Sequence, residues 1–256
     1  MAFPLTIHLG YGQEKIETSA QKQRLGTRAV LPDGRVFYYA QNSSAAITSA
    51  GQIVDGSALV GDHDMDLTAT AATAAGSLSV NIEVPTTDLT KNQYKDGYLV
   101  FNAEAGAGEV YRIKSHPLHD ASADNTVAIT VDEPDGIRTA LTTSSEAQLV
   151  YNPYTAVKVI DGDGTMTTGP LGVTTIPVTA SYYCWLQTAG PSSVLVSGTT
   201  VLIVGDGVAV SQVTGQDGSA TLWDSSGATD QVSIGTAMGI ASIAGDCGLV
   251  MLNIRP

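Results

Sequence analysis

Residues 77–84 read SLSVNIEV, a stretch in which polar and apolar side chains alternate. Leu78, Val80, Ile82 and Val84 fall on one face of an extended chain, and the serine, asparagine and glutamate between them fall on the other. Because successive side chains of a β-strand point to opposite faces of a sheet, this alternation predicts a strand with one buried face. The stretch therefore indicates a β-protein.

The segments that follow predict a small β-domain. YLVFNA, EVYRIKSH, VAITVDE and EAQLVYNP lie between residues 98 and 153 and are separated by turns rich in Gly, Asp, Ser and Asn. Strands at such spacing are typical of a small barrel or sandwich. The segment IRTALTTSSEA, residues 137–147, predicts one or two helical turns before the last strand.

The strand pattern restarts after residue 154 and predicts a second β-domain. It runs from GVTTIPVTA through YYCWLQTAG, SSVLVSG, TTVLIVGDGVAVS, ATLWDSS and QVSIGTAMGIAS to GLVMLNIRP. Residues 162–169 are expected to form its linker. In the last segment Val250, Leu252 and Ile254 alternate with other residues, which predicts that this end of the chain is fixed in a sheet.

Residues 25–41, LGTRAVLPDGRVFYYAQ, predict a β-hairpin that turns at Pro32-Asp33-Gly34. Val36 and Tyr38 would share one face of its second strand, and Phe37 and Tyr39 the other. Large apolar groups on both faces require cover on both sides. Residues 1–24 are polar enough to form an exposed arm or a short surface helix.

Together these patterns predict an all-β chain. We expect an N-terminal arm and hairpin at residues 1–44, followed by two small β-barrel or β-sandwich domains at residues 45–155 and 156–256. The low charged fraction, 14% against about 25% in typical soluble domains, and the 27 glycines also favour β-structure over helix.

Charge is unevenly distributed in this chain of net charge −13. Residues 1–50 contain five basic and three acidic side chains, and the remaining 206 residues contain seven and 22. Nucleic-acid binding requires clustered Lys and Arg, so the acidic body predicts no nucleic-acid partner. The N-terminal segment is suited instead to an acidic protein surface.

Cysteine content and hydropathy give expectations about the environment. Cys184 and Cys247 form no metal or redox motif, which favours two free thiols in a reducing compartment over a disulfide. No run approaches the roughly 20 apolar residues of a membrane helix, and the first residues lack the features of a secretory signal. We expect a soluble protein without a membrane partner.

The sequence contains no complete catalytic or nucleotide-binding motif of the common classes. GxxxxGK[ST] and GxSxG are absent, and the SxxK string at Ser19–Lys22 lacks the SDN and KTG elements that accompany it in serine acyl enzymes. Acid pairs for glycoside hydrolysis do not stand out by context. Trp185 is expected in a core or at a subunit contact. We expect neither catalysis nor a cofactor.

Metal binding is not favoured either. Asp62, Asp64 and Asp66 alternate, but a calcium loop starting at Asp62 lacks the required Gly and Glu. These aspartates, and the Asp-Gly repeat at residues 161–164, are interpreted as solvated turns. His116 and His119 are separated by a proline and are expected in a surface loop, not at a zinc site.

The chain resembles the head decoration, or cement, proteins of tailed phages. The resemblance lies in LGTRAVLPDGRVFYYAQNSSAAI, in YKDGYLVFNAEAGAGEVYRIKSHP with DEPDGIRTALTTSSEAQLVYNPY, and in YYCWLQTAGPSSVLV followed by IGTAMGIASIAGDCGLVMLNIRP. It covers nearly the whole chain, although each motif is mostly turn and strand chemistry. It implies a non-enzymatic virion protein, assembled in the host cytoplasm, that forms homotrimers on the outer face of an icosahedral head and bridges major capsid subunits.

On this hypothesis the hairpin is the capsid-docking arm, because Arg and Tyr offer bidentate pairing and a large contact area. An equal alternative places its aromatic residues in the core of the first domain. Two other functions stay open for the chain, a tail- or fibre-associated protein that binds host glycans and a depolymerase. The docking residues proposed are Arg24, Arg28, Arg35, Phe37, Tyr38 and Tyr39.

Overall fold

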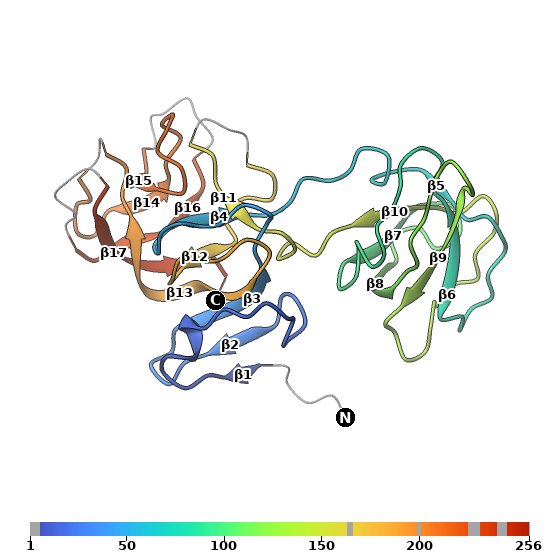
Figure 1. Ribbon diagram of the computed structural model, residues 1–256, viewed down its shortest axis with the longest axis horizontal. Coiled ribbons are helices and arrows are strands. Elements are labelled where there is room, and N and C mark those ends of the chain that lie inside the picture. Colours follow the sequence, from blue (N-terminus) through green and yellow to red (C-terminus); the bar gives the residue numbers. More distant parts are fainter. Residues whose placement is uncertain (1–5, 163–165, 199–200, 225–230, 240–244, 256) are drawn as a thin grey trace. The chain divides into compact units, whose positions relative to one another are not determined.

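The computed structural model describes residues 6–162, 166–198, 201–224, 231–239 and 245–255. The chain forms two compact units, which are coloured along the sequence in Figure 1. Unit 1 contains Met1–Ser57 and Pro153–Pro256, and unit 2 contains Ala58–Asn152. The structure therefore divides the chain at different places from the expected boundaries at residues 44/45 and 155/156, and the hairpin is not a separate arm.

Unit 2 is a nearly closed six-stranded antiparallel barrel, as the strand spacing predicted. Its strands follow the order β5-β10-β7-β8-β9-β6. A bridge between Ala69, just after β5, and Ile82 of β6 brings the two edges together. The bounds are β5 Leu67–Thr68, β6 Ser79–Glu83, β7 Tyr98–Ala103, β8 Val110–Ser115, β9 Thr126–Val131 and β10 Glu146–Val150.

The core of unit 2 confirms most of the alternation in residues 77–84. Val80, Ile82 and Val84 are fully buried, but Leu78 is 51% exposed because β6 begins only at Ser79. The prediction of helical turns in residues 137–147 is wrong. That segment contains no helix, and its Leu141 is held by a bridge to Thr73.

Unit 1 is built on an 11-stranded sheet whose main path is β1-β2-β3-β13-β17-β16-β14-β15, with β4, β11 and β12 beside it. A three-residue 3-10 helix, η1 (Gln13–Lys15), lies between β1 and β2. The bounds are β1 Ile7–His8, β2 Arg28–Val30, β3 Val36–Gln41, β4 Ile53–Asp55, β11 Lys158–Val159, β12 Gly172–Thr174, β13 Tyr183–Leu195, β14 Gly207–Val210, β15 Ala220–Leu222, β16 Ser233–Ala237 and β17 Cys247–Asn253.

Strand β13 organises unit 1. Its first half pairs with β3 and its second half with β17 (Figure 1), so two strands expected in different domains share one neighbour. The sequence suggested two strands here, because Gly190-Pro191 usually marks a turn. Instead the ladder with β3 shifts register between Gln187 and Ala189, and Gly190 takes a φ of +87° that glycine tolerates.

Two apolar clusters fill unit 1 on either side of β4. Ile53 packs in one cluster and Val54 in the other, and all three residues of β4 are buried. The prediction of a linker at residues 162–169 is wrong for those of its residues that the structure describes. The buried carboxylate of Asp55 accepts hydrogen bonds from the backbone N–H groups of Thr167 and Thr168, which ties this loop into unit 1.

The last strand behaves as predicted. Val250 and Leu252 of β17 are buried, whereas Leu249, Met251 and Asn253, which alternate with them, are exposed. In the described part of the chain, no helix has the length and apolar character needed to cross a membrane.

Candidate interaction surfaces

The hairpin is covered on both faces by its own chain. Phe37 and Tyr39 are buried in the same cluster as Leu9, Leu25 and Trp185, and Tyr39 packs on Trp185 with ring centroids 4.9 Å apart. The cover that the sequence required therefore comes from within unit 1. Both residues are buried in a core, but it is the core of unit 1 and not that of a domain at residues 45–155, which was the alternative to docking.

Tyr38, on the opposite face of β3, is half-buried in a stack of rings. Its ring lies 5.3 Å from that of Tyr154 at an interplanar angle of 2°. The guanidinium carbon of Arg255 lies 5.6 Å from the centre of the Tyr154 ring. Arg28 is the direct cross-strand partner of Tyr38. Residues far apart in sequence thus form a group of two arginines and two tyrosines, in which Tyr154 is buried and the other three are half-buried.

The other two predicted arginines lie elsewhere on the hairpin region. Arg35 forms an ion pair of 2.9 Å with Asp33 in the turn, and its guanidinium carbon lies 6.0 Å from the centre of the Phe37 ring. Arg24 is exposed, next to Leu25 in the core. Of the six predicted docking residues, the four outside the core are therefore Arg24, Arg28, Arg35 and Tyr38.

A second surface lies on the solvent side of the sheet that contains β17. Pairing places five residues in one row, on β13, β17, β16 and β14 and directly after the end of β15: Pro191 opposite Met251, Met251 opposite Thr236, Thr236 opposite Gly207, and Gly207 beside Trp223. Directly paired residues share a face of a sheet. A Cβ atom on Gly207 would lie 3.3 Å from the Cβ of Trp223, so the glycine leaves room for the indole group.

Leu249 and Met238 extend this row, because the carbonyl of Leu249 accepts a hydrogen bond from the N–H of Met238. We call the exposed apolar members of this surface the outer face. The side chains of Trp223, Met238, Leu249 and Met251 are 40–52% exposed. The outer face consists of Pro191, Trp223, Met238, Leu249 and Met251.

Acidic residues flank the outer face. Asp206 precedes Gly207, Asp224 follows Trp223, and Asp246 precedes the first residue of β17. All three are exposed, whereas the outer face itself contains no charged residue. Exposed apolar residues of the sheet thus have exposed acidic neighbours in the chain, and protein contact surfaces usually combine an apolar centre with a polar rim.

The two tryptophans have different roles. Trp185 packs in the core, as expected, but the exposed Trp223 was given no role from the sequence. A signal was present in GLVMLN, where apolar residues occupy both alternating faces of one strand. Such a strand is apolar on its outer side as well as its inner side.

A third feature is a hollow of about 370 Å³ beneath the N-terminal segment of unit 1. Tyr39 and Trp185 are its most buried lining residues, and Ile7, Leu9, Ile16 and Lys22 also line it; we call it the N-terminal hollow. The hydroxyl of Tyr39 accepts a hydrogen bond of 3.0 Å from the N–H of Lys22, which fixes residues 18–22 along the aromatic pair.

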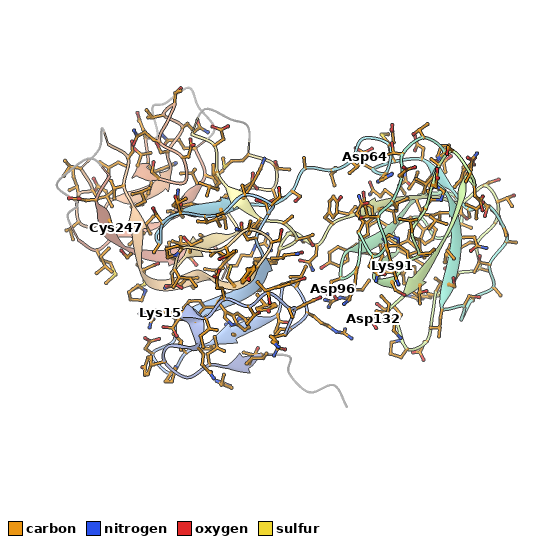
Figure 2. The ribbon with its side chains drawn as sticks, viewed as in Figure 1. Lys15, Asp64, Lys91, Asp96, Asp132 and Cys247 are labelled. Carbon is orange, nitrogen blue, oxygen red and sulfur yellow. The ribbon has the colours of Figure 1, made fainter. Side chains whose placement is uncertain are left out.

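The charge around the N-terminal hollow is basic. Lys15, Lys22 and Arg24 are exposed within or next to its lining. The nearby carboxylates are bound within the chain: Glu14 accepts a hydrogen bond from the N–H of Gly12, and Glu17 accepts two from Thr179. Figure 2 labels Lys15 on this part of unit 1 and Cys247 at the start of β17.

The histidines of unit 2 are buried, so the prediction that His116 and His119 lie in a surface loop is wrong. His63, His116 and His119 are each at most 5% exposed. Nδ1 of His63 lies 2.8 Å from the hydroxyl of Tyr94, and Nε2 of His116 accepts a hydrogen bond from the Tyr94 N–H. Burial lowers the pKa of His63 and of His116, because the charged imidazolium loses its hydration.

The aspartates considered as metal ligands lie in turns. The carboxylate of Asp62 accepts a hydrogen bond from the hydroxyl of Thr87, and that of Asp66 accepts one from the side-chain amide of Asn102. Asp163 and Gly164 lie outside the described residues. Among the described residues, no three or more His, Cys, Asp or Glu side chains are grouped to hold a metal ion.

Comparisons with known proteins add no relative: no family model matches the chain, and neither the curated proteins nor the solved structures give a match. The resemblance to head decoration proteins therefore depends on the sequence segments alone.

Proposed function

We propose that the chain is a structural protein of a tailed-phage virion. In this role it binds the outer surface of the icosahedral head as a homotrimer and stabilises the shell by bridging neighbouring major capsid subunits. It acts by contact and not by catalysis, and it needs no cofactor, nucleic acid or membrane.

The observation that carries this proposal is the outer face. The solvent side of an antiparallel sheet is normally polar, but here one row across the sheet ends in an exposed tryptophan and includes an exposed methionine. Exposed apolar side chains on the solvent side of a sheet favour a protein contact at this face, although Thr236 and Gly207 separate Met251 from Trp223. The resemblance of the sequence to decoration proteins supplies the identity of the assembly.

The arginine and tyrosine group is the part of the hairpin suited to contact an acidic capsid surface. Arg255 lies over the ring of Tyr154, Arg28 is the cross-strand partner of Tyr38, and Arg pairs with carboxylates in a bidentate manner. The buried Phe37 and Tyr39 support this group from the core and make no capsid contact.

The experiment is co-sedimentation of the purified protein with heads that lack it. We expect saturable binding, and we expect R28E to weaken it at unchanged thermal stability. Lys114→Glu, a change of the same charge on an exposed strand residue of unit 2, is the matched control. Absence of binding to such heads by the wild-type protein would reject the proposal.

A second candidate function is glycan binding by a tail- or fibre-associated protein. It is favoured by Trp223, whose exposed indole group beside Gly207 resembles a platform for a sugar ring. Glycan-array binding that is lost in Trp223→Ala, together with no binding to heads, would favour this function.

A further inference from the structure

We infer that copies of this chain associate by seating the outer face of one copy on the N-terminal hollow of another. The inference deepens the proposed function, because it names the surfaces through which copies meet. It concerns unit 1 alone, since both surfaces are built entirely from residues of that unit.

The apolar parts of the two surfaces match in chemistry. The outer face presents an indole, two thioethers and a leucine side chain. The N-terminal hollow is lined by Tyr39 and Trp185, which are almost fully buried, and by Ile16, which is 56% exposed. Its volume of about 370 Å³ falls within the range of small-ligand sites, and an indole ring is smaller than such ligands. Trp223 is therefore the side chain suited to enter it, since tryptophan anchors are typical of buried contact centres.

The charges at the two rims are opposite. Asp206, Asp224 and Asp246 flank the outer face, and Lys15, Lys22 and Arg24 flank the hollow. Opposite charges at two contacting rims steer association and fix its orientation. Glu14 and Glu17 also lie near the hollow and keep their negative charge when they accept hydrogen bonds from Gly12 and Thr179, so they offset part of the charge of the three basic residues.

Net charge limits where two copies of the chain can meet. A chain of net charge −13 repels itself unless contact occurs where opposite charges meet. The basic residues beside the hollow lie in the one part of the sequence, residues 1–50, where basic side chains outnumber acidic ones. Every copy has both surfaces, so a single kind of head-to-tail contact joins copies without any other protein.

The test reverses each rim in turn and measures molecular mass by sedimentation velocity over a concentration series, without heads. The face variant has Asp206, Asp224 and Asp246 changed to Lys, and the hollow variant has Lys15, Lys22 and Arg24 changed to Glu. We expect the wild-type protein to associate. We expect each variant alone to lose affinity by about tenfold or more, because two rims of like charge then meet.

Mixing the two variants in equal amounts provides the decisive arm. The basic face of one variant then meets the acidic hollow of the other, and the remaining face and hollow are of wild-type charge. We expect the mixture to recover association. Matched controls of the same charge change in unit 2 leave association intact: Glu104, Asp124 and Asp135 to Lys, and Lys91, Lys95 and Lys114 to Glu.

Trp223→Ala tests the apolar centre separately. Because Trp223 is exposed, we expect the variant to fold like the wild type. We expect loss of association with an unchanged circular dichroism spectrum. A wild-type protein that is monomeric at its highest soluble concentration overturns the inference. So do variants that associate like the wild type, or a mixture that stays monomeric. Because no heads are used, these outcomes are independent of head binding.

Discussion

Nε2 of His116 accepts a hydrogen bond of 3.0 Å from the backbone N–H of Tyr94, and Nδ1 of the same ring donates one of 2.8 Å to the carbonyl of Pro117. Only the neutral imidazole can make both bonds, because a proton on Nε2 removes the acceptor. His63 contacts the same tyrosine from another loop. Unit 2 thus contains two buried histidines, and the fold holds His116 in its neutral form.

Unit 2 is therefore expected to lose stability in mild acid. Burial lowers the folded-state pKa of His63 and His116, so the unfolded chain binds more protons once the pH falls below the ordinary histidine pKa of about 6.5. This contribution to stability is complete above that pH and declines below it. Hydrogen exchange of residues 58–152, followed from pH 7.5 to 5, measures the loss.

The exposed His8 of unit 1 provides the control for that experiment. His8→Gln is expected to leave the pH dependence of unit 2 unchanged, whereas H116Q is expected to flatten it. Equal protection of unit 2 at both ends of the pH range would contradict the role given to the buried pair.

Asp55 is expected to be a major determinant of unit 1 stability. Its buried carboxylate accepts hydrogen bonds from the N–H groups of Gly56, Thr167 and Thr168 and from the Thr168 hydroxyl. Asp55→Ala leaves these donors unsatisfied, at about 1–3 kcal/mol for each buried group. Thermal unfolding should show a lower transition for unit 1 only. A shift in the transition of unit 2 instead would contradict this assignment.

Phe37 provides a test of the core position of the hairpin. Phe37→Ala removes a fully buried ring and is expected to destabilise unit 1 by about 3–5 kcal/mol. Arg24→Ala, thirteen residues earlier on an exposed site, is expected to have little effect on stability. Urea unfolding monitored by the fluorescence of Trp185 and Trp223 compares the two. Similar midpoints for both variants would argue against the core position.

The two cysteines are expected to react very differently. Cys184 is buried, and burial raises the pKa of its thiol to about 12, whereas Cys247 is exposed. At pH 8 an aromatic disulfide reagent should therefore modify one thiol in the folded protein and two after denaturation. Peptide mapping should place the first modification at Cys247. Rapid modification of Cys184 in the folded protein would contradict its burial.

The sequence predicts the strands of unit 2 well because each strand reports its own burial by alternation. Val80 and Ile82 point inward, as the alternation of polar and apolar residues predicts. The predicted burial of Leu78 is wrong because alternation does not indicate where a strand begins. The expected helical turns near Leu141 fail because a long-range bridge to Thr73, and not local propensity, fixes that segment.

The division into units and the interaction surfaces were harder to predict. Pairing of β3 with β13 joins residues more than a hundred positions apart, and no local pattern encodes such a partner. His116 was misplaced because a segment with proline and charge is typical of surface loops, yet hydrogen bonds to backbone groups allow its burial. The outer face depends on register across the sheet, which only the structure provides.

The central claim is that this chain acts by seating its surfaces on neighbouring proteins of a phage head. A cryo-EM map of the parent particle tests it most directly. The account predicts density for unit 1 on the outer face of the shell, with Arg28 and Tyr38 toward major capsid subunits and Trp223 covered by another copy. Absence of the chain from the head lattice, or its presence only at the tail, would contradict the account.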